Sequence, residues 1–367
     1  MDNCVWEKAL KILNQNGYEA YLVGGAVRDY LLKLEPHDFD ITTSAKPTVI
    51  KELFCEYKTL NIGEKHGTIT VFINDIPLEI TTYRSEDNYL DNRHPEEVTF
   101  ISSLNEDLKR RDFTINALLM NQNHQVIDLV DGIKDLNNHI IRAIGNPEDR
   151  FREDALRILR AIRLKSQYGF TITSETDAAI FNQAHLLAKI SQERVAEEFM
   201  KIVKNQNIEV LKEYQAVFNP LLEYDYNEVY LCKTDNYLLK LAILFKNHPN
   251  EIDKLFLTKS LRIKIVELIK HQNADNLIAN FSEVNNHDLY LNYLGILYNR
   301  DFKNIYADLQ PYIANQNNLA ITNQELIKLG YQGPEIGKIK NYLIQNIRSM
   351  TIKNDHTAIL NLLKKKG

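Results

Sequence analysis

Two aspartates that stand two positions apart, Asp38 and Asp40, form a pattern suited to metal chemistry. We expect residues 39–42 to form a strand, and side chains two apart along a strand point to the same side. Both carboxylates can therefore bind one hard cation or a pair of cations. Glu79 lies in the next strongly β segment, 78–83, and is a candidate third catalytic carboxylate. A plainer interpretation is that Asp38 and Asp40 are solvated at a strand edge. Glu79 would then belong to the polar face of an alternating strand.

A pair of glycines precedes these aspartates, after a short apolar strand over 20–23. We predict that Gly24 and Gly25 form a turn that opens a helix over about 26–34, which contains Arg28. Backbone N–H groups at such a turn, at the positive end of a helix, can hold phosphate oxygens. A lone Gly-Gly pair is usually only a tight turn. Followed by the aspartates, it adds a phosphate cradle to a metal clamp, which is equipment for phosphoryl or nucleotidyl transfer.

Three adjacent cations begin at Lys109, within a segment that we predict to be a helix over about 105–120. Consecutive residues project around a helix, so at least one of these cations can point inward toward an anion, and we choose Arg111. Asp112 and Asn116 lie four apart on one predicted helical face and could hydrogen-bond a sugar or orient a neighbouring loop. The alternative for the whole segment is a solvated helix surface.

A predicted helix over about 148–168 carries a charged stripe at every third position, formed by Asp154, Arg157, Arg160 and Arg163. Such a stripe is commonly a set of surface ion pairs. It could instead read a nucleobase, because a carboxylate accepts from an exocyclic amine and a guanidinium donates to a ring nitrogen. Asp154 with Arg157 would then accept ATP and CTP and reject GTP and UTP. Arg160 and Arg163 would support the base or the phosphates.

The elements expected around these residues divide the chain near residue 145. Before that point we predict helices over 5–16 and 47–55, a hairpin of strands 68–73 and 78–83, a polar loop over 85–97, and strands over 125–129 and 139–144. After it we predict helices over 148–168, 174–188 and 192–204, and helical periodicity continues beyond 205. The sequence therefore favours an α+β head followed by an all-helical remainder.

Composition narrows the class of protein. The 367 residues, 44% of them hydrophobic, are enough for two or more domains of a folded soluble protein. No segment approaches the roughly 18 apolar residues of a membrane span, and we find no secretory signal. Three scattered cysteines suit a reducing cytoplasm, where we expect the protein to act. The net charge of −5 argues against a broadly basic nucleic-acid coat but leaves room for a local basic stripe.

The motifs, in this order, resemble those of bacterial class II CCA-adding tRNA nucleotidyltransferases, which are relatives of bacterial poly(A) polymerases. The resemblance is dense over residues 20–205 and thin from 206 on, apart from a patch at 330–337. The segments that carry it are Leu22-Val-Gly-Gly-Ala-Val-Arg-Asp with Asp38-Phe-Asp40, Arg110-Arg-Asp-Phe-Thr-Ile-Asn116, Asp131-Gly-Ile-Lys-Asp-Leu, Glu153-Asp-Ala-Leu-Arg157 and Ile190-Ser-Gln-Glu-Arg-Val195. Several ordered motifs make the resemblance specific.

This resemblance implies a polymerase-β-like nucleotidyltransferase head followed by an all-helical neck, body and tail. The head would span 1–145, the neck with its base-selecting helix 146–205, the body 206–300, and the tail, which contacts tRNA, 301–367. The implied reaction is template-independent addition of C, C and A to the 3′ end of tRNA from CTP and ATP, with release of pyrophosphate. The implied partner is tRNA, with no membrane and no protein partner required.

The resemblance also implies roles for the matching residues. Asp38 and Asp40 would bind Mg²⁺, and Glu79 completes the candidate catalytic set. The residues expected to contact the nucleotide are Gly24, Gly25, Arg28, Arg111, Asp112, Asp154, Arg157, Arg160 and Arg163. The motif at 190–195 would brace the base-selecting helix.

The segment from Asp87 to Pro95 matches the flexible loop that relatives adding only CC lack, so it favours addition of the terminal A as well. His94 replaces an arginine that is common in this loop. The alternative activity is that of an A-adding enzyme or a poly(A) polymerase, which the absence of a long basic C-terminal extension weakly disfavours. A catalytically silent RNA-binding module would have lost a metal carboxylate. A phosphohydrolase, prompted by His287-Asp288, would need further ligands that are not visible.

Overall fold

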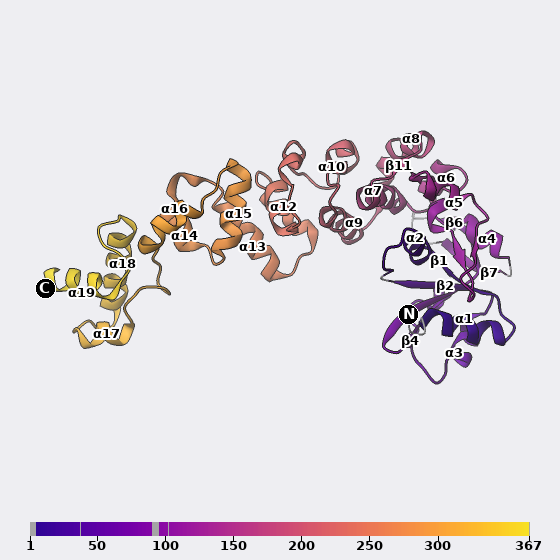
Figure 1. Cartoon of the computed structure of the whole chain (residues 1–367), viewed down its shortest axis with the longest axis horizontal. Helices are drawn as coiled ribbons and strands as arrows, with labels where there is room; N and C mark the ends of the chain where they lie inside the picture. The colour runs from indigo at the N-terminus through magenta and orange to yellow at the C-terminus, as the bar shows by residue number, and fades with distance from the viewer. Residues whose placement is uncertain (1–4, 37, 90–94, 102, 367) are drawn as a thin grey trace. The chain divides into compact units, whose positions relative to one another are not determined.

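The computed structural model describes residues 5–36, 38–89, 95–101 and 103–366. The chain divides into two compact units, Met1–Leu222 and Glu223–Gly367. The first unit combines sheets with helices, and the described part of the second consists of helices and their connections (Figure 1). The predicted order, an α+β head followed by a helical remainder, is therefore confirmed. The finer division into neck, body and tail stays a prediction.

A seven-stranded sheet organises the first unit, with the strand order β3-β4-β5-β2-β1-β8-β9. Its strands are β1 (Ala20–Val23), β2 (Phe39–Thr43), β3 (Lys58–Leu60), β4 (Thr68–Ile73), β5 (Ile76–Thr82), β8 (Leu119–Met120) and β9 (Val126–Ile127). β2 lies antiparallel to β1 and parallel to β5. This pairing sets Asp40 opposite Val23 on one side and opposite Glu79 on the other. The sheet thus brings together two of the carboxylates that the sequence singled out.

Helices pack against this sheet because their apolar residues recur at helical spacing. In α1 (Val5–Gln15), the buried residues Trp6, Leu10 and Leu13 lie on one face. The other helices of this region are α2 (Gly25–Leu31), α3 (Pro47–Leu53), α4 (Leu104–Lys109) and α5 (Gly132–Asn137), with 3₁₀ turns at Glu64–His66 and Thr114–Asn116. α1, α2, α3 and α4 lie where helices were expected, whereas α5 and the 3₁₀ turn at Glu64–His66 were not predicted.

The predicted helix over 105–120 is wrong beyond Lys109. α4 ends there, Thr114–Asn116 forms a 3₁₀ turn, and β8 follows at Leu119. The side chain of Asp112 accepts a hydrogen bond from the backbone N–H of Phe113, at 2.8 Å. Such a local side-chain bond competes with helical hydrogen bonding and disfavours continuation of the helix through this segment.

The predicted polar loop over 85–97 is also wrong where the structure describes it. β6 (Arg84–Tyr89) and β7 (Pro95–Phe100) pair as a separate antiparallel ribbon. The segment has no alternation of apolar and polar residues, so backbone pairing alone defines these strands and the sequence pattern could not reveal them. The flexible loop expected from Asp87 to Pro95, with His94, falls largely on residues 90–94, which lie outside the described residues.

Helices follow the head within the first unit. They are α6 (Pro147–Glu153), α7 (Leu156–Tyr168), α8 (Ser174–Gln183), α9 (Gln192–Lys204), α10 (Val210–Glu213) and α11 (Gln215–Phe218), with a 3₁₀ helix at Ala184–Lys189. α7 packs on α9, and α6 packs on α8. A two-residue strand, β11 (Thr171–Ile172), pairs in parallel with β10 (Ile140–Ile141), so this region is helical apart from that strand.

The predicted helix over 148–168 is two helices rather than one. Asp154 separates them, with an extended backbone at φ −138° and ψ 104°. Its carboxylate accepts from the N–H of Leu156 at 3.1 Å, which satisfies a backbone donor at the start of α7. Asp154 therefore does not lie on the helical stripe that Arg157, Arg160 and Arg163 share.

The second unit contains helices and short 3₁₀ segments. Its α-helices are α12 (Tyr237–Leu244), α13 (Lys259–Lys270), α14 (Leu277–Glu283), α15 (His287–Tyr298), α16 (Lys303–Leu309), α17 (Asn323–Lys328), α18 (Pro334–Arg348) and α19 (His356–Lys366); its 3₁₀ segments are Tyr226–Leu231, Pro249–Leu255, Ala274–Asn276 and Gln310–Tyr312. Residues from Ala314 to Leu363 form an apolar cluster of their own. None of the helices in the described chain is long and apolar enough to cross a membrane.

The fold predicts a large cost for a methyl group at Gly132. A Cβ there would overlap the carbonyl oxygen of Thr114 and lie 2.9 Å from Leu118 Cδ2, so the 3₁₀ turn would have to move. We expect Gly132→Ala to lower the free energy of unfolding by about 3 kcal/mol. Trp6, the single tryptophan, is buried in this unit and reports its unfolding by fluorescence.

Gly337→Ala is the matched control, because a Cβ at that helical position of the second unit meets nothing within 4 Å. We expect the transition that Trp6 reports to stay unchanged in this variant. Equal transitions in Gly132→Ala and the wild type would contradict the close contact.

Candidate active site

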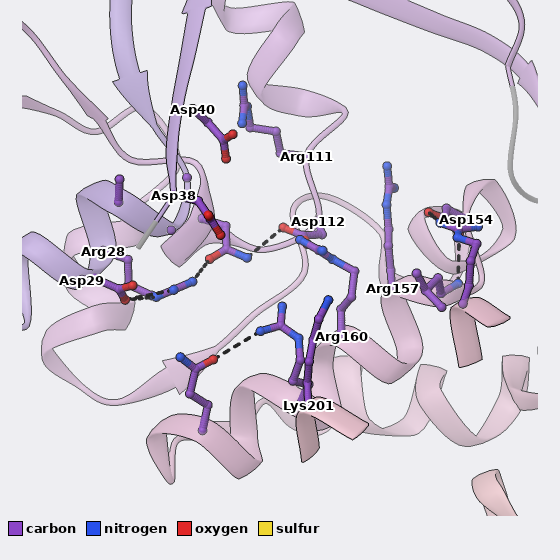
Figure 2. A pocket seen from close by; sticks show the side chains of 18 of the residues that line it. Arg28, Asp29, Asp38, Asp40, Arg111, Asp112, Asp154, Arg157, Arg160 and Lys201 are labelled. Atoms are coloured by element: carbon purple, nitrogen blue, oxygen red, sulfur yellow. Dashed lines mark hydrogen bonds and ion pairs between the residues drawn. The ribbon is translucent and has the colours of Figure 1, made fainter. Parts of the chain in front are cut away.

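A cavity of about 700 Å³ in the first unit gathers most of the predicted site residues. Eleven of the twelve line it, all except Glu79: Gly24, Gly25, Arg28, Asp38, Asp40, Arg111, Asp112, Asp154, Arg157, Arg160 and Arg163. Figure 2 shows the aspartates of the sheet on one side and the arginines of α7 on the other. Positions more than a hundred residues apart in the sequence therefore share one site.

The cavity has a strong positive excess. Nine cationic side chains and five carboxylates line it, an excess of four positive charges in a chain whose net charge is −5. The cations that were not predicted include Arg194, Lys201 and Lys204 on α9. The spacing of three between the two lysines could have indicated a shared helical face, but not the cavity that the face meets. This local charge suits a polyanionic ligand.

Asp40 and Asp38 lie at the edge of the sheet, Asp40 within β2 and Asp38 just before it. Burial, followed by the charge of the neighbouring Glu79, raises the pKa of Asp40 to about 6, against the opposing effect of Arg111. A bound divalent cation would reverse this unfavourable environment for the charged carboxylate. Asp40 is thus a carboxylate that lacks a full complement of compensating charge.

The donor set fits a divalent metal ion that is completed by ligands from a substrate. Among the described residues, no group of three or more histidine, cysteine, aspartate or glutamate side chains could hold a metal by itself. Two carboxylates, Asp38 and Asp40, are what a hard cation such as Mg²⁺ typically takes from a protein when phosphates supply the rest. Glu79 is exposed and lies beside Asp40 in the sheet, so its catalytic role stays a prediction.

The Gly24–Gly25 turn lies directly against the aspartates. Gly24 has φ +79° and ψ −138°, a conformation that favours glycine, and it precedes the first residue of α2. A Cβ on Gly24 would be 3.5 Å from Asp40 Oδ2. The turn and the carboxylate therefore form one wall of the cavity, as the order of the motifs predicted.

Arg111 reaches the cavity from the segment that follows α4. Its Nη2 donates to the buried Asp107 at 3.1 Å, and its Nε is buried without a hydrogen-bond partner. Burial raises the pKa of Asp107, but Arg111 and Arg110 outweigh this effect and hold it below its usual range. The inward orientation that we expected for Arg111 is observed, although the helix that was to supply it ends earlier.

Asp112 is fixed by two partners rather than exposed to a ligand. Arg160 donates to its Oδ2 from Nε at 2.8 Å, and Asn116 donates to its Oδ1 at 3.1 Å. Burial raises the pKa of Asp112, yet Arg160 and Asn116 hold it well below its usual range. Asp112 and Asn116 therefore do not share a helical face, as had been predicted, but bond to each other.

The proposed base-reading pair, Asp154 and Arg157, lies in the wall of the cavity, but each residue is bound to other groups. Arg157 is buried; it donates to Glu153 at 2.7 Å and to the carbonyl of Arg110 at 2.7 Å. Asp154 accepts from Arg194 Nη2 at 3.1 Å, while the buried Nη1 of Arg194 has no partner. The motif at 190–195 therefore braces Asp154 through Arg194.

Arg163 and Arg28 also have protein partners. Arg163 Nε donates to Glu198 at 2.7 Å, and Glu198 also accepts from Lys201 at 3.0 Å. Arg28 is buried and forms an ion pair with Asp29 at 2.9 Å, as Figure 2 shows. The arginines expected to meet the nucleotide are therefore oriented by carboxylates in advance, which favours a defined binding geometry.

Known proteins share both the sequence and the fold. Residues 20–142 match the Poly A polymerase head domain, and residues 169–215 match the probable RNA and SrmB-binding site of polymerase A. The CCA-adding enzyme of Lactobacillus helveticus is 54% identical over 193 residues, which are 53% of this chain and 48% of that protein. The chain thus spans about half the length of the first curated relatives it matches.

A longer match decides the family. The CCA-adding enzyme of Ligilactobacillus salivarius is 38% identical over 343 residues, which cover 92% of this chain and 81% of that protein. The chain belongs to the CCA-adding enzyme family. A crystal structure of the Bacillus stearothermophilus CCA-adding enzyme in complex with CTP has a TM-score of 0.76 and 26% identity, and covers 99% of this chain and 98% of that one. The family resemblance predicted from the motifs is confirmed.

In this member of the CCA-adding enzyme family, the unfavourable environment of the charged Asp40 should lower the free energy of unfolding. A carboxyl whose pKa is raised on folding favours the folded state while it is neutral and loses that contribution as the pH rises from about 4 through about 6. In metal-free protein at pH 8, Asp40→Asn should therefore raise the free energy of unfolding by about 2–3 kcal/mol. The gain should vanish near pH 4, as measured by Trp6 fluorescence in denaturant.

Asp75→Asn serves as the control, since Asp75 is exposed in the turn between β4 and β5. Its effect should stay small across the same pH range. A gain for Asp40→Asn that grows toward acid pH would contradict the raised pKa.

Proposed function

We propose that this protein adds C, C and A to the 3′ end of tRNA, using CTP and ATP and releasing pyrophosphate. The observation that carries the proposal is the cavity itself, where two strand-edge carboxylates face an arginine-rich helix across a Gly-Gly turn. The relatives named CCA-adding enzymes and the related structure with CTP support the same substrates. tRNA and the nucleotides are cytoplasmic, and we place the protein there.

The residues of the site divide the work of nucleotidyl transfer among them. Asp38 and Asp40 would hold Mg²⁺, which supplies charge neutralisation for the phosphates and activation of the attacking hydroxyl. The 3′ hydroxyl of the tRNA attacks the α-phosphorus, the bond to the β,γ-phosphates breaks, and pyrophosphate leaves. The Gly24–Gly25 turn and the cationic wall stabilise the negative charge of the triphosphate during this step. Positioning and electrostatics are the main contributions expected in phosphoryl-type transfer.

Base selection is assigned to Asp154 and Arg157, with Arg160 and Arg163 supporting the nucleotide. The bonds of Asp154 to Arg194 and of Arg157 to Glu153 would fix both side chains before a base arrives. For the helical remainder we propose a neck over 146–205, a body over 206–300 and a tail over 301–367 that contacts tRNA. The match of residues 169–215 to a probable RNA-binding region supports contact with RNA in this part of the chain.

Incorporation of labelled CTP and ATP into tRNAs ending before CCA, before CA and before A, with Mg²⁺, tests the activity. We expect two C residues, then one A, then a stop. A alone, added only to tRNA ending in CC, would assign an A-adding enzyme instead. Unlimited addition of A to any RNA would assign a poly(A) polymerase and overturn the proposal.

Removal of the metal carboxylate should separate chemistry from binding. We expect Asp40→Ala to abolish incorporation while tRNA binding, measured by filter retention, stays near the wild-type value. Asp75→Ala, in the exposed β4–β5 turn, should retain full incorporation. Turnover like that of the wild type in Asp40→Ala would refute the metal assignment.

Loss of the base-reading guanidinium should relax selection. We expect Arg157→Ala to reduce discrimination against GTP and UTP by about tenfold or more in kcat/KM, which corresponds to the ~1–3 kcal/mol of a base-specific contact. Arg152→Ala is the control, because Arg152 forms its ion pairs with Glu148 and Asp149 outside the cavity. Unchanged rejection of GTP and UTP would eliminate Arg157 as a selector.

A further inference from the structure

Tyr168, the last residue of α7, lies behind the cavity and belongs to none of the motifs. Its hydroxyl accepts hydrogen bonds from Arg28 Nη2 at 2.6 Å and from Gln167 Nε2 at 2.9 Å, and donates to Asp29 Oδ1 at 2.7 Å. A tyrosine hydroxyl has one donor and two acceptor positions, so its capacity is fully used. The Arg28 guanidinium also lies over the Tyr168 ring, 4.6 Å from its centroid. Tyr168 therefore holds Arg28 through both its ring and its hydroxyl.

Arg28 connects this contact to an earlier part of α7, at Arg160. Its Nη1 donates to Asn116 Oδ1 at 2.5 Å, Asn116 donates to Asp112, and Asp112 binds Arg160. The chain of bonds thus begins at Tyr168 and returns to α7 eight residues earlier, about 12 Å along the helix. Because every link is buried or partly buried, water competes poorly with these bonds.

The guanidinium that Tyr168 holds lies directly on the glycine turn. A Cβ on Gly25 would be only 3.3 Å from Arg28 Nη2, and both Gly25 and Arg28 line the cavity. A shift of Arg28 would therefore change the charge and the shape at the place where the turn meets a ligand. Without the Tyr168 hydroxyl, the Nη2 atom of Arg28 would keep only one fixed partner, Asp29, instead of two.

We propose that Tyr168 is a positioning residue, which holds Arg28 against the Gly24–Gly25 turn and so determines how tightly the site binds the triphosphate of CTP and ATP. This inference rests on the proposed nucleotidyl transfer. Tyr168 touches no substrate in this account and acts through Arg28. The triphosphate is common to both nucleotides, so the effect of Tyr168 is the same for each and leaves base selection unchanged.

Steady-state incorporation by the full-length Tyr168→Phe variant tests the proposal. This variant keeps the ring and removes only the hydroxyl. We expect the KM for CTP and for ATP to rise by the same factor, about tenfold, as the loss of a hydrogen bond to a charged group implies. We expect kcat to stay within about twofold and discrimination against GTP to stay unchanged, because binding that is equal in ground and transition states appears in KM.

Tyr214→Phe is a closely matched control in the same unit. The Tyr214 hydroxyl donates to Asp177 at 2.6 Å, and Lys165 lies over its ring at 5.2 Å, but Tyr214 does not line the cavity. Its KM values should equal those of the wild type. A merely structural role for Tyr168 would lower the active fraction and hence kcat, with KM unchanged, and that result would overturn the proposal.

A double-mutant cycle with Arg28→Lys tests whether Tyr168 acts through Arg28. We expect Tyr168→Phe to have little further effect on KM in the Arg28→Lys background. Full additivity would overturn the proposal. Should Tyr168→Phe fail to fold, Asp29→Asn weakens the charged acceptor that the hydroxyl and Arg28 share, and an unchanged KM in that variant overturns the proposal equally. A wild-type protein that adds no nucleotide to tRNA would contradict the proposed function and this inference with it, whereas wild-type activity with an unaltered KM in Tyr168→Phe contradicts the inference alone.

Discussion

The ion pair of the buried Asp112 with the partly exposed Arg160 is the interaction on which the site depends most. Arg160 belongs to α7, whereas Asp112 belongs to the segment between α4 and the central sheet, 48 positions earlier. The buried carboxylate of Asp112 costs free energy to desolvate, and its bonds to Arg160 offset that cost only in a well-formed geometry. Asn116 completes this geometry by donating to the second oxygen of Asp112. The pair therefore fixes the helix that carries the arginines in relation to the strand edge that carries the aspartates.

The same logic explains how so many arginines can share one cavity. Arg28, Arg111, Arg163 and Arg194 are paired with Asp29, Asp107, Glu198 and Asp154, respectively. Each carboxylate screens its arginine from the neighbouring cations and holds it in one orientation. Asp107 and Glu198 are buried and do not line the cavity, so the cavity surface keeps a positive excess. The arginines are thus preorganised toward the cavity without losing all of their capacity to donate.

The pKa values of two aspartates of the site shift in opposite directions because their surroundings differ. Asp112 has guanidinium and amide donors on both oxygens, and its pKa lies well below the usual range despite burial. Burial and the charges of Glu79 and Asp38 raise the pKa of Asp40 to about 6, because Arg111 opposes these effects only in part. The first carboxylate is satisfied by the protein and serves the structure. The second is left with an electrostatic deficit that a cation would remove, which suits a ligand-binding role.

The sequence alone predicted which residues line the cavity better than it predicted the bonds between them. Spacing identified Asp38 with Asp40 and the arginines of α7, because strand and helix periods are local properties. It did not predict that α4 ends at Lys109 and that Asp112 then accepts from the backbone N–H of Phe113, or that Asp154 separates α6 from α7. Partners such as Glu198 for Arg163, 35 positions away, depend on how α7 and α9 pack, which no local pattern encodes.

The charge distribution has a consequence for how the protein selects its ligands. The chain has a net charge of −5, whereas the residues that line the cavity of the first unit carry an excess of four positive charges, so the cavity attracts anions locally. A space of about 700 Å³ can admit a nucleoside triphosphate or the end of an RNA strand. A duplex is about 20 Å wide and cannot enter such a space, so the cavity discriminates by access before any base is read. The location of the positive charge would therefore favour a free strand end over a duplex, independently of the residues proposed to select the base.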